Sequence, residues 1–206
     1  MADSTMRVSF DLTQKDLKYF RRVMRDVREK HAKSSEEEIL AACRQLIEGI
    51  GRTTAPDFVR DRVGKLVILI DMLEDAEWAL SGRDRDRVLR GMAYFAEPDD
   101  MIPDKVPVLG FLDDAIMVEL VVTELEHEIE AFEDFCAYRE RRAARGAKGE
   151  NLTPRVQLLD TRRQALHDRM RRRRSRRRGS SGAVAAFISG RRRIYSCHAP
   201  GSPSWS

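Results

Sequence analysis

Cysteine is scarce in this chain of 206 residues, and its few thiols are far apart. Cys43, Cys136 and Cys197 do not have the spacing of metal ligands, and their odd number gives no disulfide framework. Isolated cysteines of this kind are typical of a reducing compartment. We therefore expect a cytoplasmic protein.

Long hydrophobic runs are also missing. The first residues lack the apolar core of a signal peptide. The most apolar stretch, residues 106–123, is interrupted by Asp113, Asp114 and Glu119. A charge at the centre of a membrane helix costs about 2.5–3.5 kcal/mol on insertion scales. We therefore expect neither a signal peptide nor a transmembrane span, and we assign this stretch to a protein core.

Motifs that support enzyme chemistry are absent as well. The sequence has no glycine-rich phosphate loop, no Gly-x-Ser-x-Gly and no Cys–His pair with nucleophile spacing. Glu124 and His127 have the Glu-x-x-His spacing, but a di-iron carboxylate site needs two such pairs, and we place His127 on a solvated face. The catalytic residues are therefore unknown, and a non-enzymatic function is favoured over an enzymatic one.

Charge is abundant and unevenly divided along the chain. The net charge is +4 and the isoelectric point is near 9.1. Residues 151–206 carry fourteen Arg against two Asp, a net +12, whereas residues 1–150 carry 24 Lys and Arg against 32 Asp and Glu, a net −8. An acidic body is thus joined to a basic tail, and each part attracts surfaces of the opposite sign.

Helical periodicity without any strand pattern predicts an all-α fold. We predict a helical bundle of about five helices, followed by a basic C-terminal helix and a disordered tail. Thr13 with Asp16, and Ser35 with Glu38, have the spacing of helix-capping residues. The later helices are predicted from Pro56 to about Leu80, from a cap at Asp84 to a stop before Pro98, and from near Asp113 past Tyr138.

Residues 94–114 are too rich in proline and glycine for a helix and too apolar for an ordinary loop. Proline removes a backbone donor and disfavours helix in the residue before it. Long helical patterns flank the segment on both sides, so we predict a rigid, buried elbow between two helices. Its distinctive residues are Tyr94, Pro98, Asp100, Ile102, Pro103, Asp104, Pro107, Gly110, Asp113 and Asp114.

The spacing Asp-x-Ile-Pro-Asp-x-x-Pro-x-x-Gly-x-x-Asp-Asp in this elbow resembles the signature of the bacterial YkvA-like domain of unknown function. A domain around the motif would span residues 60–125. The resemblance implies a small helical domain and a tendency toward membrane association, and it supplies no established activity or catalytic residue. This chain departs from that tendency, because its long acidic helical body has no second hydrophobic span.

The aspartates of the elbow allow two interpretations. As structural groups, Asp100 and Asp104 satisfy backbone donors in turns, while Asp113 and Asp114 lie at the positive end of the next helix. As a site, these four carboxylates converge and hold Mg²⁺, Mn²⁺ or Ca²⁺. The structural interpretation is favoured, so no cofactor is predicted, and a divalent cation is the alternative. Tyr94, Pro98, Pro103, Pro107 and Gly110 are assigned to the structural motif in both cases.

A run of arginines dominates the basic tail. It includes Arg171, Arg172, Arg173, Arg174, Arg176, Arg177 and Arg178. Such a run binds the phosphates of anionic lipid or nucleic acid in a salt-sensitive way. Aromatic residues that could stack on bases are missing, so base recognition is not expected. The alternatives are a solvated extension and a helix that folds back on the acidic body.

These features divide the chain into four parts. They are an N-terminal helical pair packed on the core (1–55), a YkvA-like core with its elbow at 97–114 (56–145), an Arg-rich helix (151–178) and a disordered tail (179–206). We expect a bacterial interaction or scaffold module with an unidentified protein partner, peripheral to the anionic inner membrane through its tail. The alternatives are a metal-dependent enzyme that uses the aspartates and a nonspecific nucleic-acid binder.

Overall fold

The computed structural model describes residues 11–53, 55–97, 101–102, 106, 110–146 and 155–179, and every regular element in this part of the chain is helical. The predicted all-α fold is confirmed. The predicted disordered tail lies outside the described residues. The elements are α1 (Gln14–Lys30), α2 (Glu36–Gly51), α3 (Asp57–Val63), α4 (Lys65–Glu74), α5 (Gly82–Met92), the 3₁₀ helix η1 (Ala93–Ala96), α6 (Leu112–Glu124), α7 (Glu126–Gly146) and α8 (Arg155–Gly179).

The first two helices begin at the capping residues that the sequence predicts. Thr13 accepts a hydrogen bond from the backbone N–H of Asp16, and Asp16 Oδ2 accepts one from the backbone N–H of Thr13 at 2.9 Å. Ser35 and Glu38 form the same reciprocal pair before α2, at 3.2 and 2.7 Å. Each pair satisfies two backbone donors that the helix itself leaves free.

The stretch predicted as one helix from Pro56 to Leu80 is instead two helices and a turn. α3 and α4 are separated at Gly64. A Cβ at this position would lie 3.1 Å from the carbonyl oxygen of Arg60, so glycine permits a close approach of the backbone here. Gly64 was available in the sequence as a signal of the break, but the prediction continued through it because an apolar run begins at Leu66.

The turn after α4 is fixed by a buried ion pair with α7. Asp75 Oδ1 accepts the backbone N–H groups of Glu77 and Trp78, each at 2.9 Å. Asp75 Oδ2 accepts a hydrogen bond from Arg139 Nη1 at 2.6 Å, and the two side chains are only 3% and 8% exposed. The turn positions Trp78 in the core, where its indole packs on the rings of Phe132 and Phe135.

The helix predicted from Asp113 past Tyr138 is also broken, between α6 and α7. Leu125 lies at the break with φ −97° and ψ 15°, and its side chain is fully buried. Neither glycine nor proline marks the position, so the residue types alone do not indicate it.

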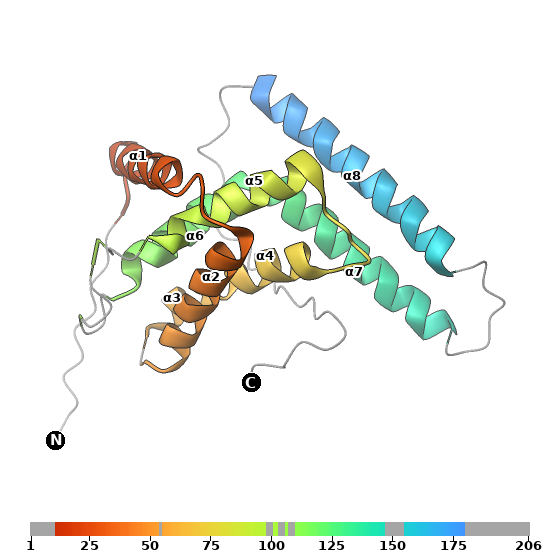
Figure 1. Ribbon diagram of the computed structural model, residues 1–206, viewed down its shortest axis with the longest axis horizontal. Helices are drawn as coiled ribbons and strands as arrows, with labels where there is room; N and C mark the ends of the chain where they lie inside the picture. The colour runs from red at the N-terminus through yellow and green to blue at the C-terminus, as the bar shows by residue number, and fades with distance from the viewer. Residues whose placement is uncertain are drawn as a thin grey trace.

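α8 lies alongside α7, as Figure 1 shows. Its N-terminal half, residues 155–170, contributes Leu159, Leu166 and Met170 to the hydrophobic core. Its C-terminal half, residues 171–179, contains arginine, serine and glycine and no apolar side chain. None of the helices in the described ranges is long and apolar enough to cross a bilayer.

Candidate functional site

The arginines of α8 lie against an acidic surface of the helical body. The acceptors come from α5 and from the N-terminal part of α7, the helix that precedes α8. The pairs are Arg171–Asp84 (2.8 Å), Arg174–Asp84 (2.9 Å), Arg174–Glu128 (3.0 Å), Arg177–Glu126 (3.1 Å) and Arg173–Glu130. We refer to Asp84, Glu126, Glu128 and Glu130 as the acidic platform.

Asp84 and Glu128 form the buried centre of the acidic platform, with exposed fractions of 4% and 1%. Arg174 contacts both carboxylates, and Arg87 of α5 donates to Glu128 at 2.9 Å. Burial acts to raise the pKa of Asp84, but the hydrogen bonds and charges of Arg171 and Arg174 outweigh it and lower that pKa. Asp84 is therefore held in its ionised form, paired with α8.

The junction between α6 and α7 receives arginines from three helices. Arg28 of α1 donates to the Glu124 carboxylate at 2.9 Å, and Arg87 donates to the Glu124 carbonyl at 3.0 Å. Arg177 of α8 donates to the Thr123 carbonyl at 3.1 Å. Carbonyls at the end of a helix carry partial negative charge, which favours cations there. α1 and the C-terminal half of α8 thus meet at one junction, along the upper side of the molecule in Figure 1.

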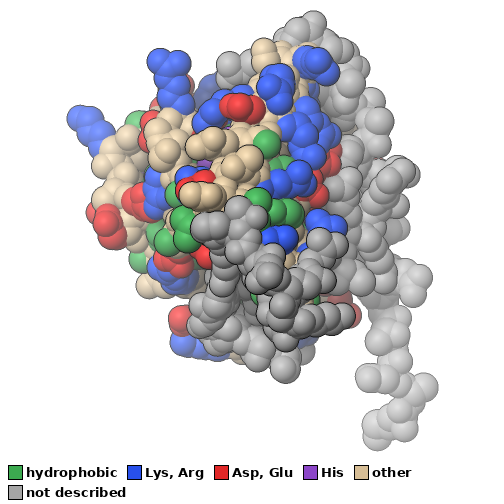
Figure 2. Space-filling view, turned by 90° about the vertical axis from the view of Figure 1, so that its right-hand side faces the viewer, with side chains coloured by type: hydrophobic (Ala, Val, Ile, Leu, Met, Phe, Trp, Pro, Cys, Tyr) green, Lys and Arg blue, Asp and Glu red, His purple; other side chains and the backbone are tan. Residues whose placement is uncertain are grey.

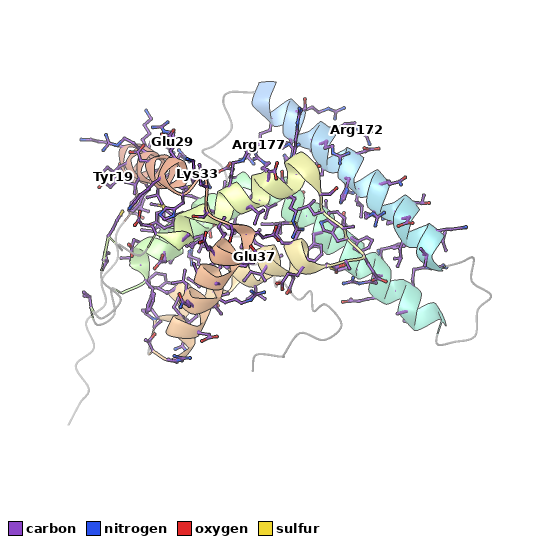
Figure 3. The ribbon with its side chains drawn as sticks, viewed as in Figure 1. Tyr19, Glu29, Lys33, Glu37, Arg172 and Arg177 are labelled. Atoms are coloured by element: carbon purple, nitrogen blue, oxygen red, sulfur yellow. The ribbon has the colours of Figure 1, made fainter. Side chains whose placement is uncertain are left out.

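Two of the predicted anion-binding arginines point away from the platform. Arg172 and Arg176 are exposed, and neither has a hydrogen-bond or ion-pair partner among the described residues. Figure 3 shows Arg172 on the outer side of α8 and Arg177 on the side nearer the body. The side chain of Arg178 lies outside the described part of the chain. On the face drawn in Figure 2, Lys and Arg side chains are interleaved with Asp and Glu.

The acidic platform was not found from the sequence. The sequence predicts Asp84 as a helix cap, whereas the structure has Ser81 at that position and Asp84 in the first turn of α5. His127, predicted on a solvated face, is half-buried, and burial together with the charge of Arg173 lowers its pKa. Glutamates at every second position, 124 to 130, were the available signal. Residues 124 and 128, and residues 126 and 130, are four positions apart and share a helical face. The spacing alone does not show that arginines of α8 pack against them.

Only part of the predicted elbow is described. Pro98, Asp100, Pro103, Asp104 and Pro107 lie outside the described residues. Tyr94 is buried in η1 beside Phe95. Gly110 is buried directly before Phe111, whose backbone is left-handed with φ +66°. The elbow therefore enters α6 through a conformation that is uncommon for a residue with a side chain.

Asp113 holds the elbow to the start of α6. Its carboxylate is 1% exposed, and Oδ2 accepts the backbone N–H groups of Met101 at 2.9 Å and Ile102 at 3.2 Å. Asp114 beside it is buried in the same first turn. Among the described residues no three acidic, His or Cys side chains are grouped to hold a metal ion. The four-aspartate cluster remains a hypothesis, because Asp100 and Asp104 are not described.

Replacing Asp113 with alanine should therefore destabilise the protein by about 2 kcal/mol, because two backbone donors lose a buried acceptor. Asp113→Asn is the matched variant, since its amide oxygen can still accept both hydrogen bonds. Its free energy of unfolding should fall clearly less than that of Asp113→Ala. Urea unfolding followed by circular dichroism measures both. Thermal shift with Mg²⁺, Mn²⁺ and Ca²⁺ on the unmodified protein tests the alternative: stabilisation that Asp113→Asn abolishes would support a metal site instead.

His167 connects α8 to the core. Its ring lies edge-on to Trp78 with centroids 4.2 Å apart. Burial, with the nearby charges of Arg171 and Arg163, lowers its pKa to about 4, although Asp84 and Asp168 act in the opposite direction. The folded protein therefore keeps this imidazole neutral at a pH at which the unfolded chain would already protonate it.

The sign of the resulting pH dependence follows from this lowered pKa. The unfolded chain takes up the proton near pH 6.5, so the contribution of His167 to stability is complete above that pH and is lost as the pH falls toward about 4. We expect the unfolding temperature to fall by a few degrees between pH 7.5 and pH 5, and to fall less in His167→Leu. Scanning calorimetry across this range measures it, and equal slopes for the two proteins would contradict the assignment.

Comparison with known protein families bears on the segment from the end of α5, through η1 and the elbow, into α6. Residues 88–120 match the model of a family described as protein of unknown function, DUF1232. The resemblance of this segment to the YkvA-like domain of unknown function is thereby confirmed. The match covers a small part of the chain and excludes the acidic platform's glutamates and α8. No curated protein and no solved structure matches the chain.

Proposed function

We propose that this protein is a non-enzymatic helical module that associates from the cytoplasm with an anionic membrane surface, through the outer side of α8. The observation that supports this is the pair Arg172 and Arg176, which are exposed and unpaired within the described residues while the arginines around them are bound to the body. Two cations one turn apart on a packed helix are available to lipid phosphates without any change in fold.

The outer side of α1 adds cations along the same edge of the molecule. Lys15, Lys18 and Arg22 are exposed there. Tyr19 lies among them at 49% exposure, with the Arg22 guanidinium 5.4 Å from the centre of its ring. Because α1 and the C-terminal half of α8 each send an arginine to the α6–α7 junction, we propose that the exposed cations of both helices contact one extended lipid surface.

The aromatic residues favour lipid over nucleic acid as the anionic partner. α8 has no Phe, Tyr or Trp in the described chain to stack on bases. Tyr19 is instead on the neighbouring helix, and an exposed tyrosine beside lysine and arginine is typical of the headgroup region of a bilayer. We therefore take anionic lipid as the partner, and duplex DNA becomes a competing outcome of the test.

Cosedimentation with vesicles tests the proposal. Each Lys or Arg near an anionic surface contributes about 1 kcal/mol, so the double variant Arg172→Glu/Arg176→Glu should bind phosphatidylserine-containing vesicles about thirtyfold more weakly. Arg52→Glu/Arg141→Glu is the control, because it makes the same change in net charge at the residue after α2 and on α7. Neutral phosphatidylcholine vesicles should not bind.

Three outcomes would overturn the proposal. The first is no binding to anionic vesicles at low salt. The second is an equal loss in the two double variants, which would assign the affinity to net charge alone. The third is tighter binding to duplex DNA than to vesicles at the same salt concentration, which would favour the nucleic-acid alternative.

A further inference from the structure

The contacts that hold α8 change in kind at residue 170. Up to that point the helix buries apolar side chains, Leu159, Leu166 and Met170, and His167 contacts Trp78. Polar contacts add to this packing, from Arg163 to the Glu77 carbonyl and from Arg169 to Asp134. From Arg171 onward every contact recorded for a described side chain is a hydrogen bond or an ion pair of arginine with an acid or a carbonyl. Residues 155–170 are thus held by apolar burial together with polar contacts, whereas residues 171–177 are held by polar contacts alone.

These forces respond differently to an anionic surface. Apolar burial is insensitive to phosphate, whereas an arginine–carboxylate pair can be exchanged for an arginine–phosphate pair of similar geometry. Arg171, Arg174 and Arg177 contact the platform at successive turns of the helix, and Arg173 pairs with Glu130 beside them. A single face of α8 therefore presents three guanidinium groups that the acidic platform now occupies.

We infer that this inner face, Arg171, Arg174 and Arg177, is a second and covered anion-binding surface, which anionic lipid takes over from the acidic platform. The outer arginines, Arg172 and Arg176, make the first contact and raise the local concentration of headgroup phosphates. The C-terminal half of α8 then lifts from Asp84 and Glu128, while residues 155–170 stay packed in the core. This inference rests on the proposed membrane association and adds a step to it.

The platform carboxylates act against lipid binding in this scheme, so neutralising them should strengthen it. Asp84→Asn/Glu128→Gln should bind phosphatidylserine vesicles about tenfold more tightly than the unmodified protein, since Arg171 and Arg174 lose their charged partners on the platform. Glu29→Gln/Glu140→Gln is the matched control: it removes the same two charges at exposed positions of α1 and α7 that have no ion pair among the described residues.

Hydrogen exchange measured by mass spectrometry provides a readout that does not depend on affinity. Amides of residues 171–177 should exchange faster in Asp84→Asn/Glu128→Gln, and in the unmodified protein when phosphatidylserine vesicles are present. Amides of residues 159–170 should stay protected in both cases, and their protection also shows that the variant is folded. The control variant should show the unmodified pattern in both segments.

The outcomes separate this inference from the proposed function. If vesicles bind but residues 171–177 keep their protection, and the platform variant binds no more tightly than the control, the covered surface is refuted and the membrane association stands. If neither the unmodified protein nor the platform variant binds anionic vesicles, the proposed function fails. Uniform loss of protection over residues 155–177 would also refute the inference, since it predicts that only the C-terminal half is released.

Discussion

Replacing Arg139 with alanine should destabilise the fold by about 3–5 kcal/mol, because it leaves the buried Asp75 carboxylate without its ionic partner. Both side chains are almost fully enclosed, and the Arg139 guanidinium also contacts Glu77 at 3.0 Å and lies 5.5 Å from the centre of the Phe135 ring. Asp75 in turn holds the turn that positions Trp78. Removing the pair should therefore loosen both α7 and the segment between α4 and α5.

Urea unfolding monitored by circular dichroism measures this effect. Arg141→Ala is the matched control, since Arg141 is exposed two positions later on α7 and, among the described residues, donates only to the Ala137 carbonyl of its own helix. We expect that variant to change stability by no more than about 0.5 kcal/mol. Similar, small losses in Arg139→Ala and Arg141→Ala would show that the buried pair does not hold the turn.

The parts of the fold that the sequence predicted correctly depend on neighbouring residues. Thr13 and Ser35 cap helices through partners three positions away, so the local pattern contains the whole interaction. The break between α3 and α4 had a local signal in Gly64, whereas the break at Leu125 had none. Leu125 is an ordinary helix former whose backbone leaves the helix where its side chain is buried between other elements.

The candidate site was harder to predict for the same reason. Charge arithmetic separated an acidic body from a basic tail, and folding back was one of the alternatives it left open. The pairing of individual acids with individual arginines depends on contacts between residues that are far apart in the sequence, such as Arg171 with Asp84 (87 positions) and Arg174 with Glu128 (46 positions). The sequence thus identified the arginines as a group, and only the structure divides them into an inner face that is occupied and an outer pair that is free to bind.

Trp78→Ala is the second variant for which we expect a large effect, a loss of about 3–5 kcal/mol. The indole is fully buried against Phe132, Phe135 and His167, and alanine would leave a cavity between α7 and α8. Phe58→Ala on α3 is the control, because this large apolar side chain is exposed and should cost no more than about 1 kcal/mol. Trp78→Phe, which fills much of the cavity, should fall between the two.

The position of the effect within α8 distinguishes this variant from the platform variant. Trp78 contacts the helix at His167, in the half that is held by apolar packing. Trp78→Phe should therefore speed hydrogen exchange in residues 159–170 first, whereas Asp84→Asn/Glu128→Gln should act on residues 171–177 alone. If both variants loosened the same amides, the two halves of α8 would be one cooperative unit, and an anionic surface could not release one half without the other.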